Sequence, residues 1–153
     1  MIFVTIGTFN FDPLIEHIDS LVEQNIIQER VICQIGNGSY IPKNCEYFKY
    51  TKEIESYILK SDLVISHGGT GSILGLISLN KPFVAVANTS LADNHQAEFL
   101  KKLSEERPIQ WISDLTKLPL AISNPTKISN HNKESGNSLS KYVRQYLLDT
   151  PSK

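Results

Sequence analysis

The chain has 153 residues, of which 41% are hydrophobic and 20% are charged, the composition of one ordinary globular domain. Its formal net charge of −1 provides no positive field for nucleic acid and no basic patch for anionic lipid. The longest apolar runs, such as FVAVA at 83–87, are far shorter than the roughly 20 residues of a membrane-spanning helix. We therefore expect a domain that neither binds nucleic acid nor crosses a bilayer.

The N-terminus and the cysteines indicate the compartment of the protein and whether it binds zinc. MIFVTIGT lacks the basic segment and the small-residue cleavage site of a signal peptide, so we expect it to form the first strand. Cys33 and Cys45 have neither CxxC spacing nor a histidine at the spacing of metal ligands. We expect reduced thiols in a cytosolic domain and no zinc site.

Short apolar segments alternate along the chain with segments of helical periodicity. Residues 12–24 show this periodicity most clearly, with Asp12 as the cap and Pro13 at the first helical position. In chain order we expect strand 2–7, helix 12–24, strands 30–36 and 45–50, helix 52–61, strand 62–67, helix 72–80, strand 81–87, helix 93–106, strand 108–113 and a short helical turn within 114–122.

This alternation predicts an α/β fold with a Rossmann-like, mostly parallel sheet and helices on both faces. We assign residues 1–122 to that domain. Residues 123–136 are polar and offer almost nothing to bury, so we expect a linker. Residues 137–150 return to helical spacing, and we expect a C-terminal helix that docks on a partner or on its own domain.

Glycines gather where the expected strands end, at Gly7, 36–38 and 68–71. Ligands of parallel sheets bind beyond the carboxyl ends of the strands, where the strand order switches. The sequence therefore predicts a binding rim at this edge. Gly7 and Thr8 lack bulk there and could meet a phosphate or the acceptor, although an ordinary turn would use the same residues.

The stretch SHGGTGS at 66–72 has more glycine and hydroxyl residues than a strand-to-helix turn needs. A helix that begins near Thr70 presents unpaired N–H groups and the positive end of its dipole, while the glycines let an anion approach. Thr70 and Ser72 can add hydroxyl donors, and His67 can add a further hydrogen bond. We predict a phosphate cradle. A plain tight turn capped by Ser72 is the alternative, because neither GxGxxG nor GxxxxGK[ST] is present.

A second polar cluster, DNHQ at 93–96, follows the fifth expected strand. Asp93 or Asn94 could cap the next helix with Gln96 as the capping partner. Capping does not explain why His95 and Gln96 are both present. Neutral donors and acceptors suit the hydroxyls of a sugar, because they avoid the desolvation cost of a full charge. We therefore predict a sugar-binding segment.

Together, SHGGTGSI, KPFVAVAN and DNHQAEF resemble the donor-binding half of GT-B glycosyltransferases of glycosyltransferase family 28. The likeness covers roughly residues 1–113 and is greatest to the small single-domain members. These include the catalytic subunit of the eukaryotic dolichol-linked N-acetylglucosaminyltransferase and bacterial PssE-type subunits of exopolysaccharide and capsule synthesis. The pairing of the HGG turn with the downstream Asn-His-Gln carries the resemblance.

The resemblance implies a role for each motif. In the family, the HGG turn holds the nucleotide diphosphate, the Asn-His-Gln segment reaches the donor sugar and its phosphate, and the first Gly-Thr lines the cleft toward the other domain. We expect His67 and Gln96 to be the catalytic residues. The expected donor-binding residues are Gly7, Thr8, Gly68, Gly69, Thr70, Gly71, Ser72, Asn94 and His95.

One position departs from the family pattern. Many GT-B enzymes carry a glutamate eight residues after the HGG histidine, where it binds the ribose hydroxyls, and this chain has Gly75 there. Ribose recognition must then come from elsewhere or be weaker. Some bacterial single-domain members share this gap, which favours the polysaccharide branch.

A GT-B active site lies between two Rossmann-like domains, and this chain supplies one. The resemblance therefore implies a membrane-associated, Rossmann-like partner that binds a lipid-linked acceptor and recruits this cytoplasmic subunit to the membrane. The expected function is the donor-binding, catalytic subunit of a glycosyltransferase. It would move a sugar from a UDP-sugar to a lipid-diphosphate-linked saccharide in cell-surface polysaccharide synthesis.

No DxD motif occurs in the chain, so we expect neither a metal nor another cofactor. Two other functions remain open. The chain could be a non-catalytic, nucleotide-sugar-binding or activating subunit, which the missing glutamate favours. It could also be a free-standing Rossmann-type metabolic enzyme, which the absence of GxGxxG and of a second substrate domain disfavours.

Overall fold

The structure is a computed structural model that describes residues 1–91 and 94–128. The expected C-terminal helix at 137–150, most of the expected linker and Asp93 lie outside the described residues.

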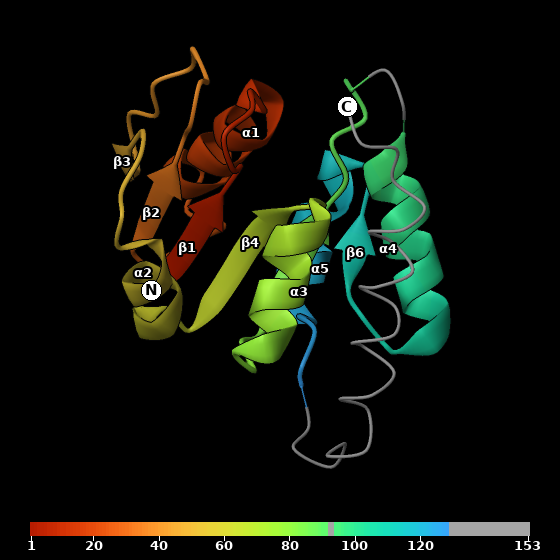
Figure 1. Cartoon of the computed structure of the whole chain (residues 1–153). Helices are drawn as coiled ribbons and strands as arrows, with labels where there is room; N and C mark the ends of the chain where they lie inside the picture. The colour runs from red at the N-terminus through yellow and green to blue at the C-terminus, as the bar shows by residue number, and fades with distance from the viewer. Residues whose placement is uncertain (92–93, 129–153) are drawn as a thin grey trace.

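The described chain forms a six-stranded sheet in the order β3-β2-β1-β4-β5-β6 (Figure 1), and all neighbouring strands pair in parallel. The expectation of a mostly parallel α/β sheet is confirmed. The strands are β1 (Ile2–Thr5), β2 (Val31–Gln34), β3 (Glu46–Phe48), β4 (Leu63–His67), β5 (Phe83–Val86) and β6 (Trp111–Ile112).

Helices connect the strands as the alternation predicts. They are α1 (Asp12–Glu23), α2 (Ile54–Lys60), α3 (Thr70–Ser78), α4 (His95–Glu106) and α5 (Leu118–Ser123), with a 3-10 turn η1 (Leu115–Lys117) before α5. Helix α3 begins two residues earlier than expected, because Gly69 is its extended cap and the Gly69 carbonyl accepts from the Ile73 N–H at 3.0 Å.

The strands are shorter than their apolar runs. β1 ends at Thr5, ahead of Gly7, which has a φ of +69°. β6 contains only Trp111 and Ile112. Thr126, which follows α5 in the chain, pairs with the first residue of β5. It exchanges backbone hydrogen bonds with Phe83 at 2.8 and 3.3 Å. A residue from the segment expected to be a linker therefore lies against the sheet.

Side chains alternate between two buried layers along each central strand. Val4 and Ile65 pack with α1 and α5, whereas Phe3 and Val64 pack with α3 and α4. Helix α2 packs on the second layer, where Tyr57 stacks on Phe3 with ring centroids 5.6 Å apart. Because both faces are covered, the central strands are largely apolar rather than alternating with polar residues, whereas the edge strand β3 keeps exposed residues.

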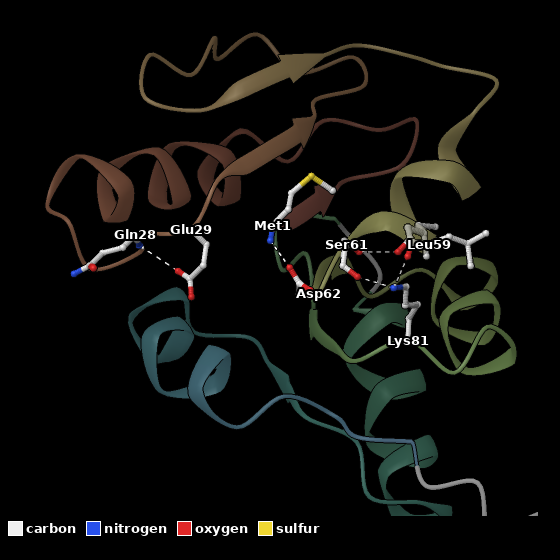
Figure 2. Close-up of polar contacts among 8 residues, drawn as sticks. Met1, Gln28, Glu29, Leu59, Ser61, Asp62 and Lys81 are labelled. Carbon is white, nitrogen blue, oxygen red and sulfur yellow. Dashed lines mark hydrogen bonds and ion pairs between the residues drawn. The ribbon is translucent and has the colours of Figure 1, made fainter.

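The amino ends of the strands are closed by polar contacts, away from the expected rim (Figure 2). Lys81 Nζ donates to the carbonyl oxygens of Leu59 and Ser61 at 2.8 and 2.6 Å, at the end of α2. The Met1 amino group pairs with the Asp62 carboxylate. A cation at the carboxyl end of a helix is favourable for the helix dipole, so Lys81 stabilises this end of the fold.

The strand order places the topological switch point between β1 and β4 (Figure 1). The chain leaves β1 toward β2 and leaves β4 toward β5, in opposite directions along the sheet. The two loops therefore diverge and leave a crevice at the carboxyl ends of these strands. The loop after β1 contains Gly7 and Thr8, and the loop after β4 contains the glycine-rich turn.

Candidate functional site

The turn between β4 and α3 is short. The Gly68 N–H donates to the Val86 carbonyl at 2.8 Å and extends the pairing of β4 with β5. Gly69 caps α3, and Thr70 is already helical. The chain thus passes from strand to helix within two glycines, which brings the start of α3 onto the rim of the sheet.

His67, the last residue of β4, lies with its ring between two glycines. A Cβ atom at Gly7 would lie 2.7 Å from His67 Nε2, and a Cβ at Gly69 would lie 2.3 Å from His67 Cε1. Real Cβ atoms do not approach other atoms this closely, so a side chain at either position would displace the ring. The glycines after β1 and β4 are therefore needed for the packing of one side chain.

The hydrogen bonds of His67 define its tautomer. The Gly69 N–H donates to Nδ1 at 3.2 Å, so the ring proton resides on Nε2. That Nε2–H group then donates to Ser72 Oγ at 3.0 Å. Burial lowers the pKa of His67 to about 4, so the ring is neutral at physiological pH. His67 therefore orients Ser72 and carries no positive charge for an anion.

The start of α3 has the features of an anion site. The N–H groups of Thr70, Gly71 and Ser72 have no acceptor among residues 1–91 and 94–128, and the first turn carries no acidic residue. Because Ser72 Oγ accepts from His67, the Ser72 hydroxyl proton is available to a ligand. Three amides, one hydroxyl proton and the helix dipole can together bind a phosphate.

Gln96, in the first turn of α4, joins the loops after β4 and β5. Its Oε1 accepts from the Gly68 N–H at 3.1 Å and from the Asn88 N–H at 2.9 Å. A Cβ at Gly68 would lie 3.1 Å from Gln96 Cβ, so the two residues are in close contact. Gln96 therefore positions the glycine-rich turn. The assignment of His67 and Gln96 to catalysis stays a prediction.

The other expected residues lie around this group. Thr8 is exposed, and its carbonyl accepts from Asn37 Nδ2 at 3.0 Å. Asn94 caps α4 with a left-handed φ of 45°, and His95 is the first residue of that helix; both are exposed. The structure thus brings Gly7, the turn and Gln96 into contact, and it leaves Thr8, Asn94 and His95 on the exposed loops of the same rim.

Two buried polar residues of the rim have no role in the sequence prediction. Asn88, 3% exposed, donates through Nδ2 to the Asn10 carbonyl at 3.1 Å and so links the loops after β5 and β1. Gln34 accepts from Thr5 Oγ1 at 2.7 Å and donates to the Gly7 carbonyl at 2.7 Å. At both positions the sequence contains one signal that could have indicated a role at the rim, a polar residue at the carboxyl end of an apolar strand.

A cavity of about 430 Å³ opens beside the turn, between α2 and α3. Thr5 and Ser66 at the ends of β1 and β4 line it, as do Gly71, Ser72 and Gly75 of α3. On the other side it is lined by Ile54, Glu55 and Ile58 of α2. The sequence prediction included α2 as a helix but assigned none of its residues to a site.

Because of its burial, His67 makes the stability of the protein pH-dependent. The unfolded chain protonates histidine near pH 6.5, whereas folded His67 protonates only near pH 4. The folded state therefore loses stability as the pH falls from 6.5 toward 4, by at most roughly 3 kcal/mol, and the loss levels off below that. Urea unfolding at about pH 7 and about pH 4.5 should show a smaller difference for His67→Gln than for the wild type. His95→Gln is the control, and an equal pH effect in all three proteins would contradict the assignment.

The fold and the rim together define a Rossmann-like domain with a candidate anion site at its topological switch point. Residues 1–144 match the glycosyltransferase family 28 C-terminal domain, so the chain belongs to that family. The resemblance seen in the sequence motifs is thereby confirmed.

The chain is also similar to a curated human protein, the UDP-N-acetylglucosamine transferase subunit ALG13, with 39% identity over 116 residues. That match covers 69% of this chain and 10% of the human protein, so the chain spans about a tenth of its relative's length.

Two solved structures share the fold. A solution NMR structure of ALG13 superposes with a TM-score of 0.57 at 24% identity, covering 94% of this chain and 96% of the other. A crystal structure of MurG from Acinetobacter baumannii superposes with a TM-score of 0.62 at 15% identity. It covers 95% of this chain and 45% of MurG. At these identities the likeness establishes the fold alone.

Proposed function

We propose that this chain is the donor-binding, catalytic subunit of a two-subunit glycosyltransferase that uses a UDP-sugar. The observation that carries the proposal is the set of amides at the start of α3 that have no acceptor within the described part of the chain, located at the switch point of a family 28 domain. The human relative is by name a UDP-N-acetylglucosamine transferase subunit, so UDP-N-acetylglucosamine is the first donor to test.

The proposed reaction needs a site that stabilises a departing diphosphate. The acceptor hydroxyl oxygen attacks the anomeric carbon of the sugar, the bond from that carbon to the β-phosphate oxygen breaks, and UDP leaves with the added negative charge. The amides of Thr70, Gly71 and Ser72 and the Ser72 hydroxyl would donate to that charge. We propose that they act without a metal or another cofactor. Asn94, His95 and Gln96 would bind the sugar and its phosphate.

The proposal includes a partner, because a GT-B cleft has two halves and this chain matches one of them. The partner would be a membrane-associated, Rossmann-like subunit that binds a lipid-diphosphate-linked saccharide and supplies the general base. It would recruit this chain to the cytoplasmic face of the membrane. None of the described helices is long and apolar enough to cross a bilayer. Surface polysaccharide synthesis is the proposed context.

The test is transfer by the reconstituted pair. The chain is co-expressed with the membrane-associated glycosyltransferase half that its genome encodes, and sugar transfer from radiolabelled UDP-N-acetylglucosamine to lipid-diphosphate acceptors is measured with and without EDTA. We expect transfer by the pair, retained in EDTA, and none by either subunit alone. Full activity of the isolated chain would overturn the two-subunit proposal, and loss of activity in EDTA would overturn the metal-free step.

A non-catalytic, donor-binding or activating subunit is the second candidate. It is favoured because both ring nitrogens of His67 and the Oε1 atom of Gln96 are engaged within the rim. Ser72→Ala distinguishes the two functions in the reconstituted pair. A catalytic subunit should lose at least about tenfold in turnover, since a hydroxyl donor to the leaving group is removed, whereas an activator should retain most of it.

A further inference from the structure

We propose that Glu55 of α2 binds the ribose hydroxyls of the donor nucleotide and thereby makes the chain selective for ribonucleotides. The proposal rests on the proposed function, because it assumes that a uridine nucleotide is the ligand. It assigns the nucleoside to the cavity between α2 and α3.

The cavity is continuous with the anion site. Gly71 and Ser72 line the cavity, and their N–H groups are among those at the start of α3 that find no acceptor in the residues the structure describes. A diphosphate bound at that turn therefore has its next chemical group at the mouth of the cavity. About 430 Å³ lies within the size range of small-molecule sites.

The walls of the cavity suit a nucleoside. Gly71 and Gly75 are one helical turn apart on α3, and a Cβ at either would meet nothing within 4 Å. A ring can therefore approach the backbone of α3 closely at both positions. Ile54, Ile58 and Leu76 supply apolar surface for a base, while Thr5 and Ser66 supply hydroxyl oxygens at the carboxyl ends of β1 and β4.

Glu55 is the acidic residue among those that line the cavity. Its carboxylate forms no hydrogen bond or ion pair with any residue in the described part of the chain. A carboxylate has two acceptor oxygens and no donor, which matches two neighbouring hydroxyls that both donate. Gly75, on the α3 wall of the same cavity, presents no side chain to the ribose. Position 55 can therefore supply the acceptor that position 75 lacks.

The test compares UDP with 2′-deoxy-UDP by calorimetry on the full chain. The variants are Glu55→Gln, which weakens the acceptor with little change of shape, and Glu55→Ala. Glu53→Gln is the matched control, because Glu53 is two residues away, exposed and absent from the cavity wall. Circular dichroism confirms folding of each protein.

The wild type should prefer UDP over 2′-deoxy-UDP by about tenfold or more, as expected for a hydrogen bond to a charged group. Glu55→Ala should weaken the binding of UDP by about tenfold and leave the affinity for 2′-deoxy-UDP nearly unchanged. The ratio of the two affinities should then be close to one. Glu53→Gln should behave as the wild type. Gly75→Glu placed in the Glu55→Ala background should restore the preference from the opposite wall, where there is space for a side chain.

Two results would overturn the inference in different ways. If UDP binds and Glu55→Ala retains the full preference for UDP, Glu55 is not the ribose ligand and the proposed function stands. If the folded wild type binds neither UDP nor 2′-deoxy-UDP, the proposed function fails and the inference fails with it.

Discussion

Replacing Gly69 with valine is expected to abolish measurable UDP binding while the sheet still folds. A Cβ at this position would lie 2.3 Å from His67 Cε1 and 2.8 Å from Nδ1, so the ring must move. Its hydrogen bonds to the Gly69 N–H and to Ser72 Oγ are then lost, and the valine side chain occupies the start of α3. Backbone strain is not the cause, because Gly69 has an ordinary φ of −65° and ψ of 133°.

We expect the affinity of Gly69→Val for UDP to fall at least about a hundredfold in calorimetry, because anion binding at a helix start depends on close backbone approach. Lys81→Met is the control. It removes a charged donor to two carbonyls at the opposite end of the strands and should lower the free energy of unfolding by about 1–2 kcal/mol. It should leave UDP affinity unchanged. A wild-type affinity of Gly69→Val for UDP would refute the anion site. A loss of UDP affinity in Lys81→Met would show that reduced stability alone is enough to weaken UDP binding.

Gln96→Leu and Gln96→Glu are expected to impair the protein in different ways. Leucine removes the acceptor of the Asn88 N–H, whereas the Gly68 N–H keeps its shorter bond to the Val86 carbonyl at 2.8 Å. One buried donor left unpaired should lower the free energy of unfolding by roughly 1–3 kcal/mol. Glutamate keeps an acceptor oxygen, so most of that stability should remain. It replaces the Nε2 donor with a negative oxygen, and UDP affinity should fall about tenfold through repulsion of the diphosphate.

Urea unfolding and UDP calorimetry on the same two proteins separate the positioning role of Gln96 from a role at the ligand. Wild-type stability in Gln96→Leu would show that the two hydrogen bonds contribute little. Undiminished UDP affinity in Gln96→Glu would remove Gln96 from the donor site, and it would then be a residue that only positions the turn.

The candidate site was partly accessible from the sequence because its main element is local. Gly68–Ser72 follow one another in the chain, directly between an apolar strand and an apolar helix, so the unpaired amides at the start of α3 could be inferred before any tertiary contact was known. The two buried linking residues, Gln34 and Asn88, could not be found in this way. Their importance depends on which backbone groups of distant loops they reach.

By itself the sequence determined the fold class and the order of the elements. Strands that are apolar throughout require cover on both faces, and strands separated by helical segments pair in parallel, so composition and period were sufficient. The ends of the strands were harder to predict from the sequence. A strand ends where backbone geometry interrupts the pairing and not where the apolar residues end, and β1 accordingly stops ahead of Gly7.

Only the tertiary structure placed β1 beside β4, at the switch point of the sheet. It brings Gly7 against the ring of His67, whose two nitrogens are then used within the turn. It also faces Glu55 and Gly75 into one cavity from separate helices. Such contacts join residues far apart in the chain, and hydrophobic periodicity, which records only which face of an element is buried, contains no information on which elements become neighbours.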